Sequence, residues 1–148
     1  MELIPINETL EENGEFAGNS LCLDSLYMTI DFYKSVGFSP PWIGYYVRQN
    51  DQLVGSGGFK GRPINGQVEI AYGTFEQYQH QGVGAAICKL LVDLSLKTDS
   101  SVRITARTLT EKNFSTRILE KNSFKFNGIV NDQDDGDVWE WEYVPPEI

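Results

Sequence analysis

The stretch YQHQGVGAAI, from Tyr78 to Ile87, decides how this chain folds. Before it, QVEIAYGT (Gln67–Thr74) alternates apolar and polar residues as a β-strand does. After it, apolar residues recur at helical spacing, at Val83, Ile87, Leu90, Leu91 and Leu94. A helix that begins beside a strand end exposes first-turn N–H groups that are unpaired and partly positive. Because Gly82 and Gly84 add no side-chain bulk there, the sequence predicts a phosphate bound mainly by backbone.

Two common phosphate-binding loops do not fit this stretch. A dinucleotide-binding fingerprint needs a third small residue where Ile87 stands, and the Gly-Lys-Ser/Thr of a P-loop is absent from the sequence. A second glycine cluster, Gly55–Gly58, falls within an expected hairpin strand. We interpret these glycines as accommodating a close approach of the backbone.

Composition narrows the class of protein. A chain of 148 residues predicts a single domain, residues 1–148. The net charge of −9, with scattered basic residues, argues against nucleic acid as a partner. The acidic balance suits a cationic substrate, although it also serves solubility alone. Cys22 and Cys88 show no metal or disulfide pattern, and no segment is apolar enough to span a membrane. We therefore expect a cytoplasmic protein without membrane partners or metal.

The order of elements predicts an α/β fold. Helices are expected between Ser20 and Gly37, from Gly82 onward, and over Asn113–Asn122, with Asn19 or Ser20 capping the first. Strands are expected over Glu2–Ile6, Trp42–Arg48, Gln52–Lys60, Gln67–Thr74, Ser101–Thr108, Phe124–Val130 and Val138–Tyr143. This order predicts a mixed, mostly antiparallel sheet of about six or seven strands flanked by three or four helices.

Two motifs resemble one known family. Gln79-His80-Gln81-Gly82-Val83-Gly84 resembles the Gln/Arg-x-x-Gly-x-Gly/Ala signature of the GNAT acetyltransferases. Downstream, TLTEKNFSTRILEKNSF (Thr108–Phe124) is similar to the last conserved helix of that family, most closely in its ribosomal-protein and small-molecule N-acetyltransferase branches. The resemblance covers about Val68 to Val130, and departs at Ser123, where the family usually has Gly.

The resemblance implies that acetyl-coenzyme A binds as co-substrate in a groove between splayed central strands. The resemblance implies that the diphosphate of the coenzyme is bound by backbone groups of Gln81, Gly82, Val83, Gly84 and Ala85. It places Gln79 over the same phosphates, and Asn113 and Ser115 against the coenzyme, although Asn113 also suits a helix cap. Residues 72–74 would pair with the pantetheine amides as an added strand, and a bulge at Gly73 would open the groove.

The resemblance also suggests catalytic roles. Glu69, on the strand before the motif, is our candidate general base, acting through water, with a solvated outward position as the alternative. A backbone N–H near Thr74 would polarise the thioester carbonyl. The family's usual acid is a tyrosine where this chain has Leu119, so Tyr72, Tyr78 or solvent would supply the proton.

Two functions remain open at this point. The first is transfer of an acetyl group to a primary amine of a small molecule or protein N-terminus. The second is a catalytically silent acyl-coenzyme A binder that acts as a sensor or interaction module. Trp139 and Trp141 share one strand face, where core packing or a homodimer contact would bury them. Asn131–Glu142 imitates a calcium loop, but its flanks favour a polar hairpin turn.

Overall fold

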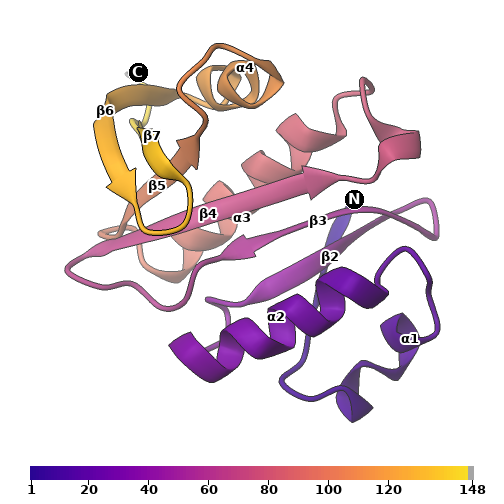
Figure 1. Ribbon diagram of the computed structural model, residues 1–148. Coiled ribbons are helices and arrows are strands. Elements are labelled where there is room, and N and C mark those ends of the chain that lie inside the picture. Colours follow the sequence, from indigo (N-terminus) through magenta and orange to yellow (C-terminus); the bar gives the residue numbers. More distant parts are fainter. Residues whose placement is uncertain (147–148) are drawn as a thin grey trace.

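Seven strands form one sheet in the computed structural model, which describes residues 1–146 (Figure 1). They are β1 (Glu2–Pro5), β2 (Gly44–Gln49), β3 (Gln52–Phe59), β4 (Gln67–Thr74), β5 (Arg103–Thr108), β6 (Phe124–Asp132) and β7 (Gly136–Tyr143). Their order is β1-β2-β3-β4-β5-β7-β6, and every neighbouring pair is antiparallel except β4–β5. The predicted mixed, mostly antiparallel sheet is confirmed.

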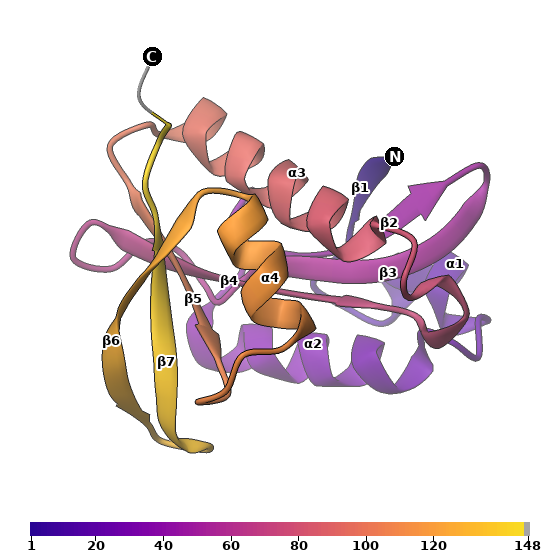
Figure 2. The same ribbon diagram turned by 90° about the horizontal axis from the view of Figure 1, so that it is seen from above.

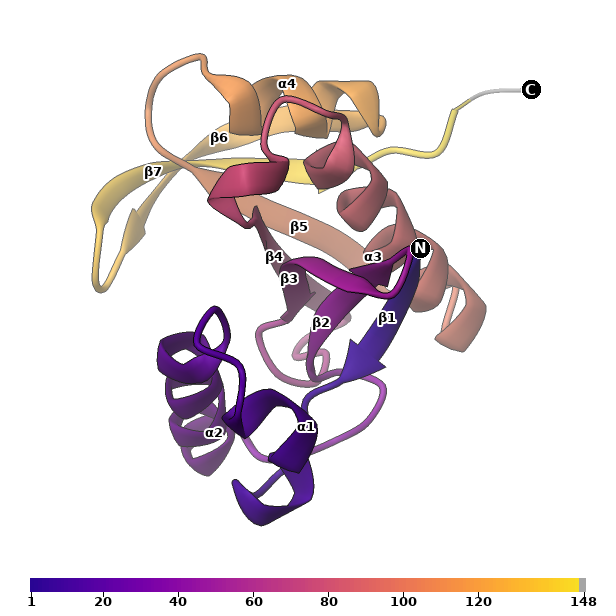
Figure 3. The same cartoon turned by 90° about the vertical axis from the view of Figure 1, so that its right-hand side faces the viewer.

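Four α-helices accompany the sheet: α1 (Gly14–Ala17), α2 (Leu23–Val36), α3 (Val83–Thr98) and α4 (Phe114–Lys121). Two short 3-10 turns, η1 (Glu11–Asn13) and η2 (Glu76–Tyr78), precede α1 and α3. Figures 2 and 3 show α2 on one face of the sheet and α3 on the other. We refer to these as the α2 face and the α3 face. Within the described residues, no helix is both long and apolar enough to cross a membrane.

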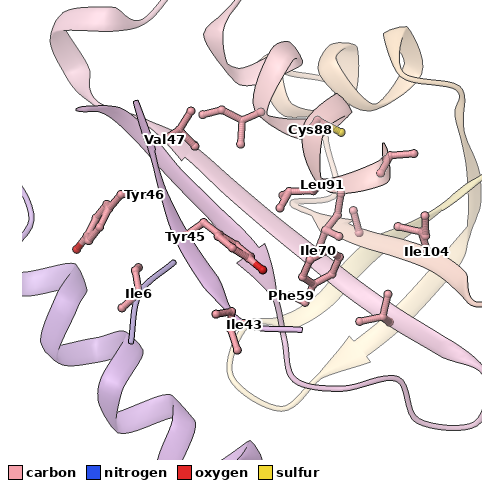
Figure 4. Packing of buried hydrophobic residues seen from close by; sticks show 14 of the residues in the cluster. Ile6, Ile43, Tyr45, Tyr46, Val47, Phe59, Ile70, Cys88, Leu91 and Ile104 are labelled. Carbon is pink, nitrogen blue, oxygen red and sulfur yellow. The ribbon is translucent and has the colours of Figure 1, made fainter. Parts of the chain in front are cut away.

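The hydrophobic core lies on both faces of the sheet, against α3 on one side and against α2 on the other (Figure 4). Val68 and Ile70, which alternate along β4, are both nearly inaccessible to solvent. They share this core with Ile87, Cys88, Leu91 and Val92 of α3. This packing fixes β4 against α3, so the end of the strand and the start of the helix have a defined relative position.

The glycines of β3 permit close packing, as the sequence suggested. A Cβ atom on Gly58 would lie 2.7 Å from the Ile43 carbonyl oxygen and 2.7 Å from Gly44 Cα. One on Gly57 would lie 2.9 Å from Ile87 Cγ2 of α3. Larger residues at these positions would push apart neighbouring backbone or lift the helix from the sheet.

The start of α2 differs from the prediction. The helix begins at Leu23 with Cys22 as its N-cap, and no side chain caps it. Asn19 instead accepts a hydrogen bond from Leu21 N at 2.9 Å, in the turn before the helix. The Asn19 side chain, which was expected to cap the helix, therefore stabilises the preceding turn instead. Gly37 ends the helix with a φ of 88°, as expected.

The last two strands form the hairpin that the sequence favoured over a calcium loop. Asp132 Oδ1 accepts hydrogen bonds from Asp134 N and Asp135 N, which closes the turn. On β7, Trp141 is 5% exposed and donates from Nε1 to Thr108 Oγ1 at 3.0 Å. Trp141 is therefore a core residue, whereas Trp139 is only partly buried.

Buried tyrosines predict a loss of stability at alkaline pH. Burial raises the pKa of Tyr33, Tyr45 and Tyr46 to about 12 each, and that of the Cys88 thiol to about 12. An unfolded tyrosine ionises near pH 10, so above that pH the unfolded chain binds fewer protons than the folded one. We expect the free energy of unfolding to fall between about pH 10 and 12, by about 1.4 kcal/mol per pH unit for each tyrosine.

Urea unfolding at a series of pH values measures this slope. Tyr45→Phe removes one ionising group and should make the slope shallower. A free energy of unfolding that stays constant from about pH 9 to 12 would contradict the prediction.

Candidate active site

A groove opens where β4 and β5 separate. Their parallel pairing runs only from Gln67–Arg103 to Ile70–Ala106, although β4 continues to Thr74 (Figure 1). A cavity of about 480 Å³ occupies the region beyond this point. It is lined by the end of β4, the loop around Tyr78–His80, the first turn of α3 and one side of α4. Segments far apart in the sequence therefore meet at one groove.

The expected bulge at Gly73 is not present. The pairing of β3 with β4 keeps a regular register from Gly55–Thr74 to Phe59–Ile70. The groove opens instead because pairing on the other side of β4 stops at Ile70. The separation of β4 from β5 therefore opens the groove, in place of the bulge that was expected within β4.

The separated edge of β4 presents unpaired backbone groups to the groove. Lys60 N donates to Glu69 O, and Phe75 N donates to Val54 O. The backbone N–H and C=O groups of the odd-numbered residues of β4, and of Phe75 just after it, therefore point toward β3. In an antiparallel pair the direction of the backbone groups alternates. The N–H and C=O groups of Tyr72 and Thr74 consequently point toward the splay, where β5 is no longer paired.

The first turn of α3 offers further backbone donors. Gly82 is the N-cap, in a left-handed conformation with φ 79°, and no side chain caps the helix. Ala86 N donates to Gly82 O, whereas the N–H groups of residues 83–85 precede any possible partner within the helix. Gly82, Val83, Gly84 and Ala85 all line the groove. The predicted anion site of helix N–H groups thus has its donors in place.

The two glycines of the motif serve different purposes. Gly82 provides a positive φ, which costs other residues about 1 kcal/mol. A Cβ on Gly84 would lie 2.8 Å from Ile118 Cδ1 of α4 and 3.4 Å from Thr74 Oγ1. Gly84 therefore allows α4 to approach α3, and Asn122 Nδ2 strengthens this contact by donating to Ala85 O at 3.1 Å.

The side chains of the motif lie partly in the groove. Gln79 lines it and its Nε2 is 3.5 Å from the Thr74 carbonyl oxygen. Gln81 is exposed, and its Nε2 lies 3.4 Å from Gln77 O, outside the groove lining. His80 has a φ of 65° and packs edge to face against Phe114 at 4.9 Å. The loop is thereby connected to α4.

Helix α4 supplies the opposite wall of the groove. Asn113 Oδ1 accepts from Thr116 N at 3.1 Å, and Thr116 Oγ1 accepts from Asn113 N at 2.9 Å, which makes a capping box. The Asn113 side chain is therefore engaged in capping and does not line the groove. Ser115 does line it, together with Arg117 and Lys121. These two cations were not predicted from the sequence: their spacing of one helical turn places them on one side of α4, but it does not show that this side faces α3.

The two candidate catalytic residues lie on opposite faces of the sheet. A Cβ on Gly57, the β3 partner of Tyr72, would meet α3, so strand alternation places Tyr72 on the α3 face and Glu69 on the α2 face. Glu69 is held by Lys60 Nζ at 2.8 Å and by Arg107 Nε at 3.6 Å. It does not line the groove, whereas Tyr72 does.

The Tyr72 hydroxyl is a neutral hydrogen-bond donor and a weaker acid than an ordinary tyrosine. Burial raises the pKa of its hydroxyl well above the ordinary tyrosine value, and the neighbouring Cys88 adds to the effect. The side chain therefore stays protonated at neutral pH. It can act as an acid or a hydrogen-bond donor but not as a base.

A second cavity of about 470 Å³ adjoins the first. It lies between α2 and the sheet, and Tyr72 and Gly73 belong to the lining of both cavities. Lys60, the ion-pair partner of Glu69, also lines it. The two cavities therefore meet at the separated end of β4, one on each side of the strand. Among residues 1–146, no group of three or more His, Cys, Asp or Glu side chains is placed to hold a metal ion.

The family of the protein follows from this geometry together with sequence comparison. Residues 11–125 match the family described as acetyltransferase (GNAT) domain. The chain belongs to the GNAT acetyltransferase family. A Bacillus subtilis (strain 168) protein named "Uncharacterized N-acetyltransferase YjdG" is 32% identical over 126 residues, which cover 79% of this chain and 71% of that protein. The resemblance inferred from the two motifs is confirmed.

Solved structures share the GNAT fold along nearly the whole chain. A ribosomal L7/L12 alpha-N-protein acetyltransferase (RimL) in complex with coenzyme A has a TM-score of 0.66 and 15% identity, covering 97% of this chain and 98% of that one. A chimera of the Vibrio cholerae spermidine N-acetyltransferase SpeG and hSSAT has a TM-score of 0.69 and 14% identity, covering 97% and 95%. At these identities the similarity shows a common fold.

The contact between Gly84 and Ile118 predicts how α4 affects coenzyme binding. Gly84→Val should displace α4 and with it Ser115 and Arg117, weakening coenzyme A binding by about tenfold, or 1.4 kcal/mol. Titration calorimetry with coenzyme A measures the change. Ala86→Val places the same side chain two residues later on α3, outside the groove lining, and should leave the affinity nearly unchanged. Equal losses in both variants would contradict the assigned role of Gly84.

Proposed function

We propose that this GNAT protein transfers the acetyl group of acetyl-coenzyme A to the primary amine of a small molecule or protein N-terminus. The observation that carries the proposal is the juxtaposition of an uncapped α3 N-terminus with the separated edge of β4. One feature suits a diphosphate and the other suits an extended chain of amides. The free, buried thiols of Cys22 and Cys88 suit a reducing compartment, and we propose a cytoplasmic location.

The residues of the groove fit the coenzyme. The first-turn N–H groups of α3 would bind the diphosphate, with Arg117 and Lys121 adding positive charge from α4. The backbone groups of Tyr72 and Thr74 would pair with pantetheine amides, because β5 does not use them. Gln79 and Ser115 line the same groove. Asn113 would act through the α4 cap, and Gln81 through its backbone.

Bound acetyl-coenzyme A supplies a thioester that an uncharged amine can attack. The attacking amine would approach from the second cavity, because that cavity shares Tyr72 and Gly73 with the groove. The Thr74 N–H, directed into the splay, would stabilise negative charge on the carbonyl oxygen. Holding the two reactants on either side of one strand end provides proximity, which is a large contribution to such reactions.

Two side chains are proposed to move protons. Glu69 lies on the same strand face as Ala71 and Gly73 and would accept the amine proton through water. Its ion pairs with Lys60 and Arg107 hold it in place, but they also compete for the same oxygens. Tyr72, which lines the groove, would donate a proton to the departing thiolate. It takes the role of the tyrosine that the family usually has where this chain has Leu119.

The second candidate function is a catalytically silent acyl-coenzyme A binder. It is favoured by the engagement of Glu69 in ion pairs and by the presence of Leu119, which is 1% exposed and contributes to the core. Both functions predict coenzyme binding and differ in turnover. A panel of primary amines with acetyl-coenzyme A, followed by thiol release, separates them. Release that depends on the amine supports the transferase, whereas tight binding with no release above background supports the silent binder.

Substitution of the proton-transfer residues tests their roles. Tyr72→Phe and Glu69→Gln should each lower kcat by 10²–10⁴-fold, the usual contribution of a general acid or base, with little change in coenzyme affinity. Glu142→Gln is the matched control, because it alters an ion-paired carboxylate on β7 that lies outside both cavities. Unchanged kcat in either variant would remove that residue from the mechanism.

A further inference from the structure

The residues that line the second cavity indicate which class of acceptor amine it can bind. It lies under α2 and shares Tyr72 and Gly73 with the coenzyme groove, so an amine in it can reach the separated end of β4. A Cβ on Gly73 would meet no atom within 4 Å, so the junction is open. The inference that follows rests on the proposed transferase function and concerns the substrate class of that site.

The walls of this cavity are largely apolar. Its lining includes Met28 and Phe32 of α2, Ala71 of β4 and Ile6. Met28 and Phe32 are 72% and 39% exposed, so part of each side chain is accessible to a ligand. Their exposure at an open cavity suits an apolar group of a ligand.

The polar side chains of the cavity are already engaged. The Tyr33 hydroxyl donates to Ile6 O at 2.8 Å and accepts from Gly44 N at 2.9 Å. Thr29 Oγ1 donates to Ser25 O at 2.8 Å, and Lys60 Nζ is paired with Glu69 at 2.8 Å. Among the described residues that line the cavity, the hydroxyls of Ser56 and Tyr72 are the polar side-chain groups left without a hydrogen-bond partner.

The described lining of the cavity includes no carboxylate. The neighbouring Glu69 is held by Lys60 and Arg107. A ligand with a second ammonium group would therefore bury a charge without a counter-ion, which is unfavourable. A ligand with one amine and an apolar body would lose its proton on attack and would leave only apolar surface against Met28 and Phe32.

We propose that the acceptor is a primary monoamine carried on an apolar body, such as an arylalkylamine, rather than a polyamine. The chain thus differs in acceptor class from the spermidine N-acetyltransferase with which it shares its fold. The same chemistry is present in a hydrophobic N-terminal residue of a peptide, and the experiment separates that source from a free amine.

The test compares phenethylamine, spermidine and the dipeptide amide Phe-Ala-NH₂ with acetyl-coenzyme A. We expect kcat/KM for phenethylamine to exceed that for spermidine at least about tenfold. Calorimetric titration of the coenzyme A complex should show the same preference without turnover. A dipeptide amide faster than phenethylamine supports the apolar class with a peptide source. Spermidine equal to or faster than phenethylamine overturns the acceptor proposal and leaves the transferase function standing.

Two matched variants locate the preference in the cavity. Phe32→Asp places a carboxylate in the lining and should lower kcat/KM for phenethylamine about tenfold while raising that for spermidine. Tyr27→Asp adds the same charge on α2 at a 50% exposed position outside the lining, and should alter neither. If Phe32→Asp does not fold, Met28→Asp makes the same change at a more exposed position.

The outcomes distinguish a failure of the acceptor proposal from a failure of the transferase function. Equal effects of Phe32→Asp and Tyr27→Asp would show that overall charge sets the preference, which overturns the assignment to the cavity. Coenzyme binding with no thiol release for any amine would overturn the transferase function itself, and the acceptor proposal with it.

Discussion

The early end of the pairing between β4 and β5 is the constraint on which the site depends. Up to Ile70 and Ala106 the two strands are paired, and beyond them the backbone of Tyr72 and Thr74 has no partner on β5. Unpaired backbone groups inside a protein are costly unless water or a ligand satisfies them. The open edge is stable here because it borders a solvent-accessible groove. The core that anchors Val68 and Ile70 against α3 holds it in a fixed position.

The same separation brings the two ligands of the proposed reaction together. The N-terminus of α3 and the wall formed by α4 define the coenzyme side, and α2 defines the acceptor side. The end of β4 belongs to both. Close packing at Gly84 and Ile118 sets the width of one cavity, while the apolar residues of α2 set the chemistry of the other. In the proposed reaction, the coenzyme would be recognised mainly by backbone groups and the acceptor mainly by side chains.

Local signals explain which features could be predicted. The bounds of β4 were predicted as observed, because alternation from Gln67 to Thr74 is regular and is bounded by turns. The anion site at Gly82 was predicted because it depends on a short stretch of backbone. The prediction of a bulge at Gly73 was wrong because a glycine is compatible with both a bulge and a regular strand. Arg117 and Lys121 were missed because their proximity to α3 depends on the packing of α4.

The sequence by itself determined the order of elements, the family and the helix N-terminus that can hold an anion, because periodicity and glycine spacing are local properties of the chain. Only the tertiary structure showed that Glu69 and Tyr72 lie on opposite faces of the sheet, and that Glu69 is paired with Lys60 and Arg107. It alone revealed a second cavity with an apolar α2 wall. Strand registers and helix packing bring these residues together across long sequence separations, which no local pattern records.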